Sequence, residues 1–82
     1  MQMNMKTIDN QSSIELCNRL EDRLVAFAHG NRRPPTWRES DDIFFKTIGD
    51  SGLMGFMTAD SLEELCNRQK SVMKTLRKTS HR

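Results

Sequence analysis

The residues best suited to binding chemistry are basic and lie in two segments. In the first segment, NRRPPTWR (residues 31–38), three arginines surround the only tryptophan, beside two adjacent prolines. A guanidinium offers forked donors to a phosphate or a carboxylate, and an exposed indole stacks on a base or anchors a protein interface. The stiff Pro-Pro corner favours a pre-organised display. The sequence therefore predicts a partner-binding site formed by Arg32, Arg33, Trp37 and Arg38. The alternative is that the indole covers a small core and the arginines stay solvated.

The second basic segment is the C-terminal stretch of the chain. Residues 61–82 hold six basic and two acidic residues, so the excess positive charge of this +2 chain lies there. Such a cationic flank suits contacts with phosphate backbones. The possible phosphate contacts are Lys70, Lys74, Arg77 and Lys78. A solvated helix end, with cations that favour the helix dipole, is the alternative interpretation.

The same residue types give little support for catalysis. His29 and His81 lie at a helix end and in the terminal tail, without an obvious base or orienting partner. The neighbours Asp41 and Asp42 point about 100° apart on a helix, which suits capping better than paired acid chemistry. We expect neither an enzyme nor a bound cofactor or metal ion, because glycine-rich phosphate loops and zinc-binding spacings are absent from the sequence.

Three amphipathic segments are expected to carry these residues. Apolar side chains recur at three- and four-residue steps and predict helices near 12–28, 40–48 and 61–78. Capping boxes at Ser12/Glu15 and Ser61/Glu64 mark two helix starts, and Ser40 marks the third. Gly30 is expected to end the first helix in a left-handed conformation. The sequence thus predicts an all-α fold: a disordered leader (1–11), one three-helix domain with a Pro-Pro connector (12–78) and a flexible basic tail (79–82).

The core is expected to come from one stripe on each helix. The first helix contributes Leu16, Cys17, Leu20, Leu24, Phe27 and Ala28; the second Ile43, Phe44 and Ile48; the third Leu62, Leu65, Cys66, Gln69, Val72, Met73 and Leu76. After the interruption at Gly49–Gly55, the residues Leu53, Met54, Phe56 and Met57 are also expected in the core. Both cysteines are interpreted as buried free thiols, with a disulfide as the alternative.

A short internal echo links the first and third helices. Residues 12–19 and 61–68 share the pattern S-x-x-E-L-C-N-R. A duplication would predict that these helices pack antiparallel around a local two-fold axis, with Cys17 and Cys66 at similar depth. Convergence on a good helix start explains the shared pattern equally simply.

Length and composition restrict the function. A chain of 82 residues that is 35% hydrophobic supports only a thin core, so its apolar stripes favour self-association or a partner. No apolar run is long enough to cross a membrane, and the start lacks the apolar stretch of a signal peptide, so we expect a cytoplasmic protein. The sequence predicts a small non-enzymatic regulator that binds another protein, as an inhibitor or adaptor, and forms a homo-oligomer. The alternative is a nucleic-acid-binding regulator that uses both basic segments.

Overall fold

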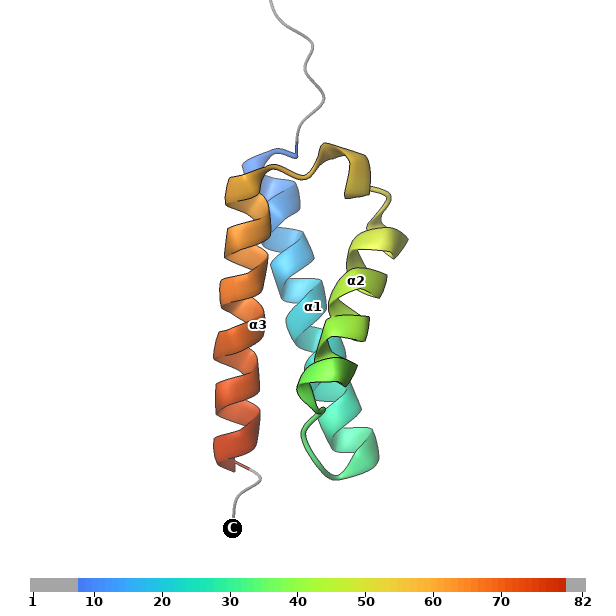
Figure 1. Cartoon of the computed structure of the whole chain (residues 1–82), viewed down its shortest axis with the longest axis vertical. Coiled ribbons are helices and arrows are strands. Elements are labelled where there is room, and N and C mark those ends of the chain that lie inside the picture. The colour runs from blue at the N-terminus through green and yellow to red at the C-terminus, as the bar shows by residue number, and fades with distance from the viewer. Residues whose placement is uncertain (1–7, 80–82) are drawn as a thin grey trace, which may run out of the picture.

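The fold is a bundle of three α-helices. A computed structural model describes residues 8–79, in which α1 (Asn10–Asn31), α2 (Trp37–Ser51) and α3 (Ala59–Thr79) are joined by short connections, with the 3-10 helix η1 (Met54–Phe56) before α3. The chain runs down, up and down again in the view of Figure 1, so α1 and α3 are parallel and α2 is antiparallel to both. The predicted all-α class and its three helices are confirmed for this part of the chain.

All three helices begin earlier than predicted, and in α1 and α3 the reason is that other side chains cap them. A carboxylate oxygen of Asp9 accepts a hydrogen bond from the backbone N–H of Ser12 at 2.7 Å. The hydroxyl of Thr58 accepts one from the N–H of Ser61 at 3.1 Å, and Ser61 Oγ accepts one from the N–H of Thr58 at 2.8 Å. Ser12 and Ser61 are therefore not the N-caps: each lies within the first turn of its helix.

The predicted leader, residues 1–11, extends too far. Asn10 and Gln11 are helical, and the N–H of Ile8 donates to the carbonyl of Phe56 at 2.9 Å, which ties the start of α1 to η1. Residues 1–7 of the expected leader, and 80–82 of the expected tail, lie outside the described residues. Thr79 is the last residue of α3.

The C-terminal end of α1 also lies beyond the predicted residue. Gly30 is helical, and the left-handed residue is Arg32, with φ 57°. Gly52 ends α2 with φ 76°, a conformation that glycine adopts without a steric penalty. The helix thus continues through Gly30, the residue expected to end it, and Arg32 adopts the left-handed conformation that glycine favours.

The core comes mainly from the predicted stripes. Its buried members are Leu16, Cys17, Leu20, Leu24, Phe44, Ile48, Leu65, Val72 and Met73. The prediction that the segment around η1 belongs to the core is wrong for Met54, which is 57% exposed. Leu53, Phe56 and Met57 are half-buried, and Met57 packs against the core. Leu62 is also 38% exposed, because it lies at the margin of the α3 stripe.

A polar contact fixes α2 against α3. The amide nitrogen of buried Gln69 donates to the hydroxyl of buried Ser40 and to a carboxylate oxygen of Asp41, the latter at 2.9 Å. Among the described residues, every buried side-chain nitrogen and oxygen has a hydrogen-bond partner. Because an unsatisfied buried amide is costly, this contact specifies the register of α2 on α3.

Polar pairs also show how α1 lies on α3. Ser13 Oγ donates to Glu64 at 3.0 Å, and Arg68 donates to Asn18 at 3.1 Å and to Glu21 at 2.8 Å. Residue numbers rise together along both helices, so the two echo segments lie side by side in parallel. The antiparallel packing expected from a duplication is therefore wrong.

The two cysteines of the echo also lie at different depths. Cys17 is buried and Cys66 is half-buried, and both are free thiols. The expected burial is confirmed for Cys17 and only in part for Cys66.

No helix within residues 8–79 is both long enough and apolar enough to cross a membrane.

Candidate functional site

The fold brings the two basic segments together. Because α1 and α3 are parallel, the connector that follows α1 lies at the same end of the bundle as the C-terminus of α3 (Figure 1). The contact of Gln69 with Ser40 places the start of α2 level with the middle of α3. All the side chains of the two predicted sites therefore lie in one half of the molecule, which we call the basic end: Arg32, Arg33, Trp37, Arg38, Lys70, Lys74, Arg77 and Lys78.

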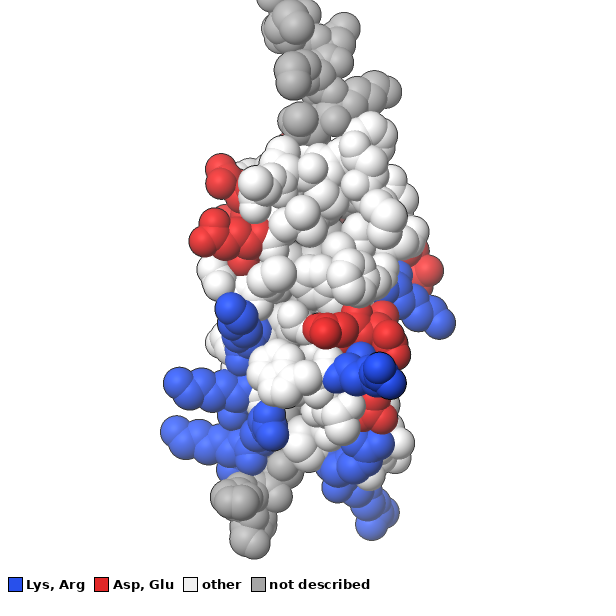
Figure 2. Space-filling view, in the orientation of Figure 1, with Lys and Arg blue, Asp and Glu red and all other residues white. Residues whose placement is uncertain are grey.

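The basic end is strongly cationic despite the small net charge of the chain. Residues 28–38 and 70–79 together hold seven Lys and Arg and no Asp or Glu. In Figure 2 most Lys and Arg side chains gather in the lower half of the molecule, and acidic ones mark the upper end of α3. Glu39 pairs with one of these cations, Arg33. Charges further apart than about 8–10 Å are screened at physiological salt, so acids at the opposite end of the bundle do not cancel the field of the other cations.

A shallow groove runs between the end of α1 and the end of α3. It has a volume of about 460 Å³ and is lined by Ala28, His29, Arg32, Arg33, Leu76 and Thr79. Apolar side chains form part of its lining, and groups that donate hydrogen bonds form the rest. Such a surface suits a ligand that has both flat apolar parts and anionic groups.

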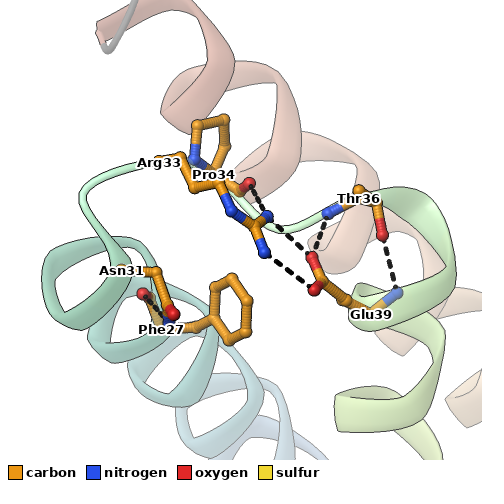
Figure 3. Close-up of polar contacts among 6 residues, drawn as sticks. All are labelled: Phe27, Asn31, Arg33, Pro34, Thr36 and Glu39. Atoms are coloured by element: carbon orange, nitrogen blue, oxygen red, sulfur yellow. Dashed lines mark hydrogen bonds and ion pairs between the residues drawn. The ribbon is translucent and has the colours of Figure 1, made fainter.

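Arg33 is held by contacts within the protein (Figure 3). Its two terminal nitrogens donate to the two carboxylate oxygens of Glu39, both at 2.9 Å, and one of them also donates to the carbonyl of Pro34 at 3.2 Å. The guanidinium carbon lies 5.3 Å from the centre of the Phe27 ring. Arg33 therefore braces the connector against α1 and α2, and its donors are largely used internally.

Glu39 completes this arrangement and starts α2. It accepts a hydrogen bond from the N–H of Thr36 at 2.8 Å and donates its own N–H to the Thr36 hydroxyl at 3.1 Å, which is a capping box. The ion pair with Arg33 and the bond from Thr36 lower the pKa of Glu39 to about 2. The prediction that α2 starts at Ser40 is therefore wrong, because Thr36 caps the helix and Ser40 is buried inside it.

Arg32 occupies an unfavourable backbone conformation at the centre of the basic end. Its φ of 57° is the only positive φ of a non-glycine residue in the described chain. A Cβ atom in the left-handed region costs about 1–2 kcal/mol, and glycine or asparagine is the usual occupant. Because strained residues concentrate at functional sites, the arginine at this turn supports a role for its exposed side chain.

Trp37 and Arg38 open α2 and face solvent. The indole is 44% exposed, so part of it is open to a partner and the rest is covered by the protein. Arg38 is exposed as well. With Arg33 braced, the freely presented groups of the connector are Arg32, Trp37 and Arg38.

The end of α3 supplies the second set of cations. Lys70, Lys74, Arg77 and Lys78 are all exposed, and the last two lie in the final turn. Their positive charge complements the partial negative charge of the helix C-terminus. They also extend the cationic surface of the connector along the outside of α3.

Sequence reasoning missed three contributors to this site. Glu39 organises the connector, and the pattern Thr36-x-x-Glu39 was the available signal, because it is a capping box directly after the prolines. His29 and Thr79 line the groove only because the ends of α1 and α3 meet, which no local pattern indicates.

The site contains no arrangement typical of a metal centre. Across residues 8–79, no group of three or more His, Cys, Asp or Glu side chains is placed to hold a metal ion. The fold thus defines a small three-helix bundle with one cationic end. The chain matches no known family model, no curated protein and no solved structure.

Proposed function

We propose that this protein is a small non-enzymatic binding protein whose basic end binds single-stranded nucleic acid. The observation that carries the proposal is that two cationic segments, far apart in the sequence, lie in the same half of the bundle as an indole that is 44% exposed. A cytoplasmic location, expected from the sequence, is part of the same proposal.

The chemistry of the basic end favours a polyanion with flat bases. Arg33 is paired with Glu39, and the six remaining Lys and Arg match the regular spacing of phosphates better than a single carboxylate. Trp37, 44% exposed beside Arg38, offers a face on which a base can stack. A single strand suits this geometry, because the cations line the sides of packed helices and no free helix projects into a major groove.

A protein partner is the second candidate, and exposed apolar side chains favour it. Phe45 on α2 is 60% exposed, and its ring makes an edge-on contact with Phe44 at 5.2 Å between ring centres. Ile14 and Met54 are 49% and 57% exposed. An inhibitor or adaptor that binds through these side chains would tolerate changes at the basic end, which separates the two proposals.

Fluorescence of Trp37 tests the nucleic-acid proposal directly, because it is the only indole in the chain. Oligothymidylate and oligouridylate of about 12 nucleotides should quench it, whereas polyglutamate should not, because only bases stack. With roughly five phosphate contacts, the logarithm of the binding constant should fall with the logarithm of salt concentration at a slope of about −3.5.

Matched variants show whether the basic end carries the binding. Replacing Arg38, Arg77 and Lys78 together by Gln should reduce the salt slope by about 2. Replacing Arg19 and Lys46, which are exposed cations outside the basic end, should leave binding unchanged. Absence of binding at low salt, or equal losses in both variants, would overturn the proposal. Binding of polyglutamate through the same cations would instead favour an acidic protein partner.

A further inference from the structure

The outward face of α3 carries an ordered row of polar side chains. Six exposed residues follow one another at steps of three and four, so they lie on one face of the helix. In chain order they are Asp60, Glu63, Asn67, Lys70, Lys74 and Arg77. We call this row the α3 stripe.

The α3 stripe has no partner within the part of the protein that the structure describes. None of its side chains forms a hydrogen bond or an ion pair with residues 8–79. The charges of α3 that face α1 behave differently, because Glu64 accepts from Ser13 at 3.0 Å and Arg68 pairs with Glu21 at 2.8 Å. The helix therefore has one satisfied charged side and one that is open to a partner.

The charges of the helix are separated along its length. Residues 59–67 contain no Lys or Arg, and residues 65–79 contain no Asp or Glu. Figure 2 shows this order, with acidic side chains at the upper end of α3 and basic side chains along its lower half. Such a helix is complementary to itself when two copies lie antiparallel, whereas parallel copies would place like charges together.

We propose that the α3 stripe is an interface between two copies of this chain, packed antiparallel about a two-fold axis. Glu63 then lies opposite Lys74 of the second copy, and Asp60 lies opposite Arg77 of the second copy. Both pairs are symmetric about the same point, between residues 68 and 69, which is close to the middle of Ala59–Thr79. The two-fold axis makes each pair occur twice, and the helices overlap along almost their whole length.

The margin of the α3 stripe adds a modest apolar contribution. Leu62, 38% exposed, and half-buried Cys66 lie on the side toward α2, as their spacing from Gln69 shows. Exposed ion pairs contribute little individually, so we expect a weak dimer that salt dissociates. Since Lys74 and Arg77 also belong to the basic end, dimerisation and nucleic-acid binding are mutually exclusive at these residues.

Sedimentation of the protein alone tests the interface independently of the proposed function. In about 20 mM salt the protein should show a concentration-dependent dimer, and in about 500 mM salt it should be monomeric. Glu63→Lys and Lys74→Glu should each raise the dimer dissociation constant by about tenfold or more, because two attractive pairs become repulsive. The double variant should restore the dimer. Lys46→Glu on α2 is the control and should not change the dissociation constant.

Two results would contradict the proposed interface. A wild-type protein that remains monomeric up to about 1 mM at low salt contradicts it, and so does a double variant that fails to recover. Each variant should remain folded, because these positions are exposed and unpartnered. Helix content measured by circular dichroism checks this. A protein that forms this dimer at high concentration, but does not bind nucleic acid at concentrations well below the dimer dissociation constant, would contradict the proposed function alone.

Discussion

Arg32→Gly should stabilise the protein and weaken its binding at the same time. Arg32 holds φ at 57°, which costs a residue with a Cβ about 1–2 kcal/mol, whereas glycine adopts this conformation freely. Glycine loses more backbone entropy on folding, which offsets about 0.5–1 kcal/mol of that gain. The net stabilisation of about 0.5–1 kcal/mol corresponds to a rise in melting temperature of roughly 2–8 °C for a domain of this size. Thermal unfolding followed by circular dichroism measures it.

Arg32→Ala is the matched control for this prediction. It removes the same charge but keeps the Cβ atom, so it should melt several degrees below Arg32→Gly. Both variants lose one cation of the basic end, so both should reduce the salt slope of nucleic-acid binding by about 0.7. Equal melting temperatures for the two variants would refute the strain argument, whatever their binding.

Three further predictions concern paired and buried side chains of the bundle. Glu39 should titrate with a pKa of about 2 by NMR. Because this pKa is lowered on folding, the stability that Glu39 contributes is fully present above the ordinary pKa of a carboxyl group and is lost as the pH falls toward 2. Arg33→Ala should raise the pKa of Glu39 toward its usual value. An unchanged pKa in this variant would contradict the role of the ion pair. Gln69→Ala should lower the free energy of unfolding in urea by about 1–3 kcal/mol, because the buried hydroxyl of Ser40 loses its hydrogen-bond donor. Lys70→Ala, at an exposed position, should lower it by less than about 0.5 kcal/mol, and equal losses in the two variants would contradict this reasoning. Burial raises the pKa of the Cys17 thiol, so iodoacetamide should label only the other cysteine in the native protein and both in denaturant; rapid native labelling of Cys17 would show that it is not buried.

Local patterns in the sequence predicted the helices better than their ends. The stripes that contain Leu20, Leu24 and Met73 are continuous, and burial follows them closely. Asp9, almost one turn before Ser12, also carries a side-chain oxygen that can cap a helix, and Asp9 is the residue that caps α1. A pattern that tolerates such a shift identifies a helix without fixing its first residue.

The candidate site was predicted as residues but not as one surface. Each basic segment is visible in the sequence, whereas their meeting depends on α1 and α3 being parallel, which follows from the path of the whole chain. The role of Arg33 was also hidden, because the sequence does not show that Glu39 turns back toward it. Tertiary contacts thus decided which of the predicted arginines are available.

The hydrogen bond between Ile8 and Phe56 has a practical consequence for labelling the protein. It anchors the amino-terminal side of α1 beside η1, at the pole of the molecule farthest from the final turn of α3 (Figure 1). A fluorophore or purification handle fused ahead of this point stays clear of the cationic pole. The same handle attached after α3 would crowd that pole and obscure the titrations described above.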